Sequence, residues 1–284
     1  MNITFIGGGN MACALIGGLL QQDYSSTQIQ VAEINAETRE RVRHQFDVET
    51  VAEFARGMSD DKGIIVLAVK PQQLSIVARE LAPLLKQNLV ISIAAGIRVK
   101  TLSNWLGGHT RIVRAMPNTP ALVRSGVTGL YAMTGVNEEE KRKAEAILRA
   151  VGTVLWVESE ELLDAVTATS GSGPAYVFYF IEAMQKAGQE LGLDANQARK
   201  LSIETFLGAA RLAVESMEDV SVLRARVTSP GGATERAIKS MENDDVKNGI
   251  IRAIHASYQR SREMGDQLGG DMTKEPYASR KVNG

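Results

Sequence analysis

Residues 225–236 combine the residue types that can hold a small carboxylic acid. The segment reads Ala-Arg-Val-Thr-Ser-Pro-Gly-Gly-Ala-Thr-Glu-Arg, so a turn rich in small residues stands directly before an amphipathic helical pattern. Such a turn exposes backbone amides at the positive end of the helix dipole, and together they bind a carboxylate. Pro230 fixes one φ angle, while Gly231 and Gly232 let the backbone approach a ligand closely. The Thr234 hydroxyl can add one directed hydrogen bond.

A second chemical signal lies at the other end of the chain, where the apolar residues 3–6 run into Gly7-Gly8-Gly9-Asn10-Met11-Ala12. A Gly-x-Gly-x-x-Ala pattern between a strand and a helix is typical of a dinucleotide-binding turn, because the glycines permit the tight turn and the close approach of a pyrophosphate. The alternative is a tight turn without a ligand. The strands and helices that follow favour the cofactor.

Glu33 lies at the end of the second predicted strand. An acidic side chain about 20 residues after the glycines commonly meets the ribose 2′-hydroxyl of the cofactor. Glu33 therefore disfavours a 2′-phosphate, whereas Arg39, Arg41 and Arg43 in the next helix include a candidate phosphate partner, although charges of this kind usually form a solvated face. Both NADH and NADPH remain open at this point.

Three further segments lie at the ends of predicted strands, where the ligands of open α/β sheets collect. They are Ala68-Val69-Lys70-Pro71, Ser92-Ile93-Ala94-Ala95-Gly96 and Met116-Pro117-Asn118-Thr119-Pro120. Small residues there would let the nicotinamide and the phosphates lie against the backbone. We expect the Asn118 amide to orient the nicotinamide carboxamide. A solvated loop lysine at Lys70 and a structural connector at 116–120 are the alternatives.

These residues need a scaffold, and the pattern of apolar residues predicts one. Up to about residue 155, strands are predicted at 2–6, 28–32, 63–69, 88–94 and 111–115, with helices at 10–22, 71–86 and 98–106. This alternation predicts a doubly wound parallel sheet. After Trp156 the periodicity is helical throughout, over 158–168, 174–192, 194–217, 219–227, 233–242 and 244–267.

The predicted organisation is a dinucleotide-binding domain over 1–158, an all-helical substrate-binding and dimerisation domain over 159–268, and a tail over 269–284 that we expect to be disordered. Small residues and apolar residues at helical spacing in the second half predict faces that bury against a second copy. A self-contained helical domain is the alternative.

The composition narrows the function classes. The chain has 284 residues, of which 44% are hydrophobic and 23% charged, and a net charge of −1, which gives nucleic-acid binding little electrostatic support. Cys13 is the single cysteine, so there is no intrachain disulfide, and the three histidines lack metal-ligand spacing. We expect no metal, no membrane span and a cytoplasmic location.

With these motifs the chain resembles the pyrroline-5-carboxylate reductases, which catalyse the last step of proline biosynthesis. The most specific segments for the resemblance are Ser170-Gly171-Ser172-Gly173-Pro174-Ala175-Tyr176 and Ser229-Pro230-Gly231-Gly232-Ala233-Thr234. The resemblance implies a Rossmann-like α/β domain followed by an all-α dimerisation domain, as in 6-phosphogluconate dehydrogenases. It also implies an intertwined homodimer, and larger rings of dimers occur in the family.

The resemblance also implies the site residues. NADPH or NADH would contact the glycine-rich turn and the strand ends, and with Asn118 the predicted cofactor set is Gly7, Gly8, Gly9, Asn10, Met11, Glu33, Asn35, Ala68, Val69, Lys70, Ala95, Gly96 and Asn118. The substrate, 1-pyrroline-5-carboxylate, would contact Ser229, Gly231, Gly232, Ala233 and Thr234, with an acidic residue at Glu160 or Glu161 nearby. One departure is Ala32-Glu33-Ile34-Asn35, which lacks the Ser/Thr-rich pattern associated with NADPH use.

The expected reaction is hydride transfer to a cyclic imine. A protonated imine is already electrophilic, so the enzyme can act mainly by positioning, with amides of Gly232 and Ala233 on the substrate carboxylate and the Thr234 hydroxyl on the ring nitrogen. No general acid is evident in the sequence. Two other readings are a β-hydroxyacid dehydrogenase of the same fold, against which the missing lysine after residues 171–175 counts, and a non-catalytic NAD(P)-binding sensor, which would not need the 229–234 turn.

Overall fold

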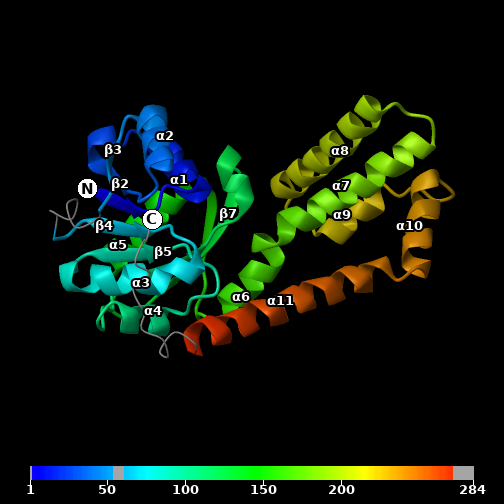
Figure 1. Ribbon diagram of the computed structural model, residues 1–284. Coiled ribbons are helices and arrows are strands. Elements are labelled where there is room, and N and C mark those ends of the chain that lie inside the picture. The colour runs from blue at the N-terminus through cyan, green and yellow to red at the C-terminus, as the bar shows by residue number, and fades with distance from the viewer. Residues whose placement is uncertain (1, 54–60, 271–284) are drawn as a thin grey trace, which may run out of the picture. The chain divides into compact units, whose positions relative to one another are not determined.

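The computed structural model describes residues 2–53 and 61–270 of the chain, and they form two compact units (Figure 1). The first unit comprises residues 1–171 and 257–284, and the second comprises residues 172–256. The division therefore falls after Gly171, later than the predicted boundary at 158, and the described residues from 257 onward belong to the first unit again. The predicted tail, 269–284, lies outside the described residues beyond Gly270.

The first unit is built on an eight-stranded sheet in the order β3-β2-β1-β4-β5-β6-β7-β8. The strands are β1 (Ile3–Ile6), β2 (Ile29–Ala32), β3 (Glu49–Val51), β4 (Ile64–Leu67), β5 (Leu89–Ser92), β6 (Ile112–Met116), β7 (Gly126–Ala132) and β8 (Gly152–Trp156). All neighbours are parallel except β6 and β7. That pair is antiparallel because the nine-residue stretch between them contains only a 3₁₀ turn, Thr119–Val123, which is too short for a crossover helix.

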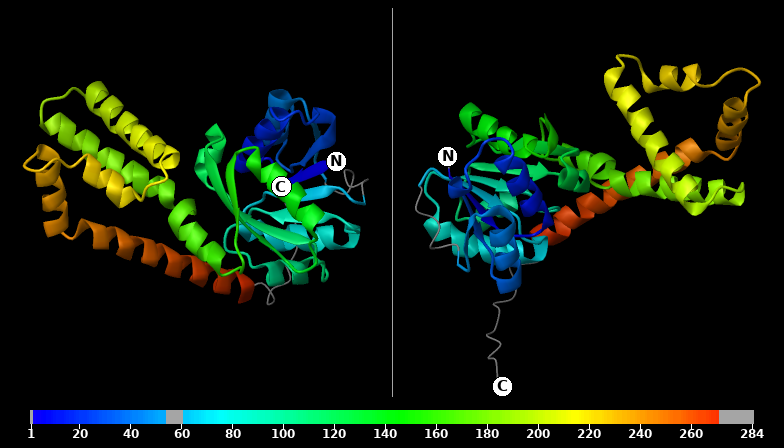
Figure 2. Two further views of the ribbon diagram at one scale, coloured as in Figure 1. Left: turned by 180° about the vertical axis from the view of Figure 1, so that it is seen from behind. Right: turned by 90° about the horizontal axis from the view of Figure 1, so that it is seen from above.

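Helices cover both faces of this sheet, as expected for a doubly wound fold (Figure 2). They are α1 (Asn10–Leu20), α2 (Ala36–Phe46), α3 (Pro71–Leu81), α4 (Val99–Trp105), α5 (Glu138–Arg149) and α6 (Leu162–Val166), with the π turn Thr167–Gly171 after α6. Side chains of α1, α2 and α5 share one core with Ile64 and Val66, whereas side chains of α3 and α4 share the other with Ile65 and Leu67. The unbroken apolar run of β4 is thus explained by burial on both faces.

The all-helical part of the chain begins within the first unit, with α6. Residues of α6 pack on β7, since a Cβ atom placed on Gly129 would come within 2.8–3.1 Å of the Val166 and Leu163 side chains. Only a residue without a side chain fits between this strand and helix. Because of this close packing, α6 and the π turn belong to the first unit, and the boundary between the units falls after the π turn rather than at the end of β8.

The second unit contains α7 (Gly173–Glu190), α8 (Ala195–Glu215), α9 (Val220–Arg226), α10 (Ala233–Asn243) and the beginning of α11 (Val246–Gly270). Gly192 ends α7 with a φ of +101°, and Asp194 then begins α8 with a reciprocal capping box to Gln197. Within the described residues, no side chain of α7, α9 or α10 is fully buried. The unit therefore does not enclose a core of its own in a single chain.

The end of α11 belongs to the first unit because a buried carboxylate holds it there. Asp164 is 1% exposed; its Oδ1 accepts a hydrogen bond from Ser261 Oγ at 2.7 Å, and its Oδ2 pairs with Arg98 Nη2 at 2.6 Å. Met264 and Leu268 lie against Gly96. Among the described residues, no helix is long and apolar enough to span a membrane, and no cluster of side chains could hold a metal ion.

Candidate functional site

The turn between β1 and α1 leaves space for a ligand at the start of a helix. Gly7 has a φ of +102°, and a Cβ atom there would lie 2.8 Å from the Ala68 carbonyl oxygen, so this position accepts only glycine. Gly9 is the N-cap of α1, where no side chain caps the helix, and a Cβ atom on Gly9 would meet nothing within 4 Å. Uncapped first-turn amides facing open space are suited to a phosphate group.

A cleft of about 550 Å³ lies beside this turn. It is lined from four adjacent strand ends, those of β3, β2, β1 and β4, and from α3. Of the predicted cofactor residues, the cleft brings together Gly7, Gly9, Glu33, Asn35, Ala68, Val69 and Lys70. The strand order β2-β1-β4 explains why residues so distant in the sequence meet at one edge of the sheet.

Three other residues of the glycine-rich segment border this cleft without being part of its lining. Gly8 is buried, and its amide donates a hydrogen bond to Glu33 Oε2 at 2.8 Å. Asn10 is exposed and Met11 is half-buried in the first turn of α1. The backbone amides of Asn10 and Met11 remain predicted phosphate donors, whereas the Gly8 amide already donates to Glu33.

Glu33 is held rigidly at the end of β2. Besides the Gly8 amide on one oxygen, its Oε1 accepts a hydrogen bond from the Asn35 amide at 2.8 Å. Asn35 in turn caps α2 by accepting from the Thr38 amide at 2.8 Å. The carboxylate is therefore fixed in the wall of the cleft by two backbone donors.

Two exposed isoleucines are among the cleft residues that were not predicted from the sequence. Ile34 is 81% exposed and Ile76 is 50% exposed, and both line the cleft together with Val77. Exposed isoleucines cost hydration free energy unless a ligand covers them, and a flat base fits between aliphatic side chains. In the sequence, the only hint of this apolar wall was Ile34 directly after Glu33. A single apolar residue at a strand end is too common to predict a ligand contact.

The predicted contacts at Ala95, Gly96 and Asn118 lie outside this cleft. Gly96 has a φ of +74° and is buried beneath Leu268 and Met264, whose side-chain atoms would lie 3.1 and 3.5 Å from a Cβ atom there. Ala95 beside it is half-buried. The glycine therefore permits the close approach of α11, a role that sequence reasoning did not foresee.

The Asn118 side chain also forms its hydrogen bonds within the protein. Its Nδ2 donates to the backbone oxygen of Ser170 at 3.1 Å and to Ser170 Oγ at 3.2 Å, and its Oδ1 accepts from the Val127 amide at 2.8 Å. The side chain ties the loop after β6 to the π turn and to β7. The structure thus supports the alternative of a structural connector for Asn118.

The Pro-Gly-Gly segment forms a tight turn before α10. The Gly232 amide donates to the Ser229 carbonyl oxygen at 3.0 Å, and Gly231 has a φ of +73°. With Pro230 at the second position, this is a type II turn, which requires a positive φ at its third residue. Because the Gly232 amide is used inside the turn, the free donors are the first-turn amides beginning with Ala233, and the predicted role of Gly232 as a carboxylate donor has no support here.

Thr234 is exposed in the first turn of α10. Among the described residues its hydroxyl has no hydrogen-bond partner, and no side chain caps this helix. Glu235 instead reaches back, so that its Oε2 accepts from the Gly231 amide at 2.8 Å. The hydroxyl that was predicted to contact the substrate is thus not used to satisfy its own backbone.

Glu160 has a partner within the first unit. Its Oε1 accepts hydrogen bonds from Arg114 Nη1 and from the Val99 amide, both at 2.8 Å. The Arg114 side chain is 2% exposed, so this is a buried ion pair linking β6, α4 and the start of α6. Glu161, the other predicted acidic residue, is exposed. The geometry gives Glu160 a structural role, and a contact with substrate stays a prediction.

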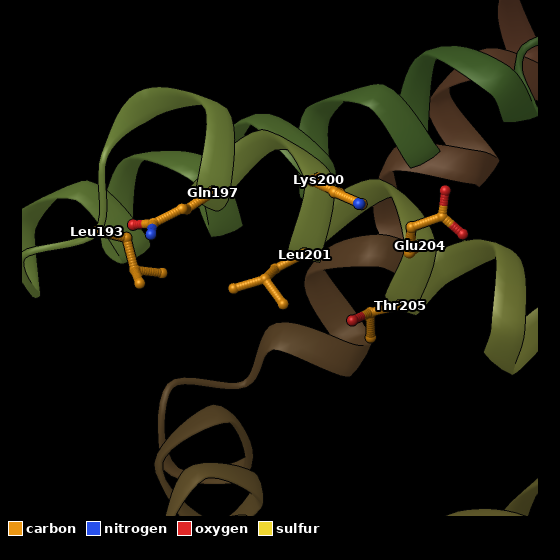
Figure 3. A pocket seen from close by; sticks show the side chains of 6 residues that line it. All are labelled: Leu193, Gln197, Lys200, Leu201, Glu204 and Thr205. Carbon is orange, nitrogen blue, oxygen red and sulfur yellow. The ribbon is translucent and has the colours of Figure 1, made fainter.

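A second hollow lies on α8, and Figure 3 shows it at close range. It is lined by Leu193, Gln197, Lys200, Leu201, Glu204 and Thr205. Most of these side chains come from one face of α8, and Leu201 is 56% exposed. This surface combines apolar and charged side chains, and none of the predicted site residues lies in it.

Two family models match the chain. The model described as pyrroline-5-carboxylate reductase dimerisation matches residues 160–264. The model described as NADP oxidoreductase, coenzyme F420-dependent, matches residues 2–96. The two matches fall on the helical region and on the glycine-rich half of the sheet.

Similar proteins cover nearly the whole chain. The pyrroline-5-carboxylate reductase of Pseudomonas aeruginosa is 46% identical over 94% of this chain and 98% of its own. A solved structure of a pyrroline-5-carboxylate reductase from Coxiella burnetii is 44% identical, with a TM-score of 0.88 over 93% of this chain and 98% of its own. The pyrroline carboxylate reductase of Plasmodium falciparum, solved with NADP bound, is 29% identical, with a TM-score of 0.82 over 93% and 98% of the two chains.

Proposed function

The chain belongs to the pyrroline-5-carboxylate reductase family, and we propose that it transfers a hydride from NADH or NADPH to the C=N bond of 1-pyrroline-5-carboxylate, which yields L-proline. The observation that carries the proposal is the pairing of a dinucleotide cleft with an uncapped helix start after a Ser-Pro-Gly-Gly turn. The match to the relatives spans both features.

The described cleft has the features that a dinucleotide needs. The pyrophosphate would lie at the start of α1, over Gly9 and against the amides of Asn10 and Met11. The ribose would meet Glu33, and the adenine would lie between Ile34 and Ile76. When bound, the reduced nicotinamide supplies the hydride.

The substrate carboxylate would bind at the start of α10. The amides of Ala233 and Thr234 lie in the first helical turn, where no intrahelical partner exists, and the helix dipole favours an anion there. The Thr234 hydroxyl would hold the ring nitrogen. The residues of this chain then act by orienting the ring, since a protonated imine needs little further activation.

We further propose that the enzyme acts as a homodimer through its second unit. The family model matching 160–264 describes dimerisation, and the helices of this unit expose large apolar side chains, with Phe178 at 66%, Tyr179 at 73% and Leu212 at 64%. Such faces are stable when a second copy covers them. The need for a pool of reduced dinucleotide favours the cytoplasm as the place of action.

One assay separates this activity from the alternatives. The oxidation of NADH and of NADPH is followed with 1-pyrroline-5-carboxylate, with the same ring lacking its carboxylate, and with a 2-oxoacid. We expect turnover of the first compound, and much weaker turnover of the second because the start of α10 has nothing to bind. Turnover of the 2-oxoacid instead would indicate a hydroxyacid dehydrogenase, and binding without any turnover would indicate a sensor.

A further inference from the structure

We propose that this chain selects NADH over NADPH, and that Glu33 is the residue that makes the distinction. The inference rests on the proposed function, because it concerns the cofactor that the same cleft would hold. It concerns one position on that cofactor, the 2′-oxygen of the adenosine ribose, which is a hydroxyl in NADH and a phosphate in NADPH.

The first argument is that Glu33 cannot easily move away. Each of its oxygens accepts a backbone hydrogen bond at 2.8 Å, one from Gly8 and one from Asn35. Turning the side chain out of the cleft would leave both amides without their partner, which costs free energy. The same carboxylate can accept a hydrogen bond from a ribose hydroxyl, but it repels a phosphate placed there.

The second argument is that, within residues 2–53 and 61–270, the two arginines nearest Glu33 bind backbone oxygens and do not line the cleft. Arg39 Nη1 donates to the backbone oxygen of Glu33 at 2.8 Å, and Arg41 Nη2 donates to that of Gly8 at 3.3 Å, so neither guanidinium lines the described cleft. Lys70 does line it, but at the end of β4, with β1 standing between β4 and β2. The remaining charged residue of the lining, Glu80, is acidic.

The third argument comes from Ile34. This side chain is 81% exposed and lines the cleft directly after the acidic residue. Its aliphatic surface suits an adenine ring but offers no donor to a phosphate oxygen. Ile34 therefore adds no phosphate partner beside Glu33, which leaves the carboxylate to decide the preference.

The test is equilibrium binding of NADH and NADPH to the full-length protein, followed by nucleotide fluorescence without substrate. We expect NADH to bind about 10- to 100-fold more tightly, since a charge contact of about 4 Å in a partly solvated cleft corresponds to that range. Glu33→Gln should remove most of the preference by strengthening NADPH binding at least fivefold. Glu37→Gln, on the exposed first turn of α2, removes the same charge outside the cleft and should leave the preference unchanged.

The outcomes separate this inference from the proposed function. Wild-type protein that binds NADPH as tightly as NADH overturns the inference, yet turnover of 1-pyrroline-5-carboxylate with either cofactor would leave the function standing. Equal loss of preference in Glu33→Gln and Glu37→Gln would also overturn it, because the effect would then be a general one of net charge. If Glu33→Gln proves unstable in a thermal unfolding control, the wild-type ratio and the double variant Glu33→Ser/Ile34→Arg, expected to favour NADPH, decide the matter.

Discussion

At the scale of single residues, Thr234 is the side chain on which the proposed chemistry most depends. Its hydroxyl is exposed at the start of α10 and has no partner among the described residues. We expect Thr234→Ala to lower kcat/KM by about 10- to 1000-fold, the range for losing one directed polar contact at a reacting centre. Steady-state rates measured with saturating cofactor check this.

Thr234→Ser is the matched control, because it keeps the hydroxyl and should retain most of the activity. The thermal unfolding temperature of both variants should stay near that of the wild type, since the side chain is exposed and unpaired. Rates for Thr234→Ala within twofold of the wild type would remove the hydroxyl from the mechanism.

Glu160 and Arg114 form a buried ion pair. We expect its loss to lower the free energy of unfolding rather than the rate of catalysis. Arg114→Met leaves a carboxylate that is 12% exposed without its cation. Breaking a buried ion pair by removing one partner costs about 3–5 kcal/mol. We expect the free energy of unfolding, measured in urea, to fall by that amount, while the KM for 1-pyrroline-5-carboxylate stays near the wild-type value.

Glu160→Gln distinguishes the structural role from the predicted substrate contact. The amide oxygen can still accept from the Val99 amide and from Arg114 Nη1, so the charge pairing is lost but both hydrogen bonds are kept, and stability should fall less than in Arg114→Met. A tenfold rise in KM with unchanged stability would show instead that Glu160 contacts the substrate.

These residues also show the limits of reasoning from sequence. The predictions for Glu33 and for the Thr234 turn rest on local spacing relative to a strand or a helix start. The protein partners of Asn118 and Glu160 could not be predicted, since Ser170 and Arg114 lie far away in the chain and no local pattern names them. A polar side chain near a strand end looks the same whether it meets a ligand or the protein.

At the scale of elements, the turn from β1 to α1 contains one glycine that the fold requires and another that only cofactor binding should require. A methyl group on Gly7 would collide with the Ala68 carbonyl at 2.8 Å and would require an unfavourable positive φ, whereas a methyl group on Gly9 would enter open space. We expect Gly7→Ala to lower the unfolding temperature clearly, because such strain costs about 1–3 kcal/mol. Gly9→Ala should unfold like the wild type.

Cofactor binding should respond differently in these two variants. The Gly9 methyl group would stand where the pyrophosphate approaches the start of α1, so we expect NADH affinity to fall at least tenfold in a protein of normal stability. Fluorescence titration measures this fall. Unchanged affinity in Gly9→Ala would mean that the phosphates do not lie on this turn.

The predicted elements were right where periodicity decides them. Unbroken apolar runs gave the central strands, and the confirmed doubly wound fold follows from their alternation with helices. The reversal of β7 was not predicted, because a short 3₁₀ turn replaces a crossover helix there. The packing of Met264 and Leu268 over Gly96 could not be predicted from the sequence either. Periodicity shows that a helix has an apolar face but not which strand end that face covers.

At the scale of the whole molecule, the second unit is the part that a single chain leaves incomplete. Its helices expose large apolar residues, and within the described residues its fully buried side chains are Ala198 and Ser202. The first unit has two well-buried cores on its sheet. Association should therefore matter for the second unit and for the proposed substrate site at α10, but not for the cleft in the first unit.

Phe178→Asp tests this separation of roles. Phe178 is 66% exposed on α7, so a carboxylate there costs little in a free chain but a great deal in an apolar interface. We expect the wild type to sediment as a dimer or larger at micromolar concentration, and Phe178→Asp to shift towards the monomer with at least a tenfold loss of kcat/KM. NADH binding should stay within threefold of the wild type, because the cleft is built from the first unit alone.

Phe178→Leu is the matched control, since it keeps an apolar side chain and should preserve both the dimer and the activity. A Phe178→Asp protein that still sediments as a dimer would place the interface on another face of the second unit. A monomer that retains full activity would show that one chain completes the substrate site by itself. The expected pattern, monomer with intact cofactor binding and lost turnover, arises only if the acid-binding turn depends on the second copy while the nucleotide cleft does not.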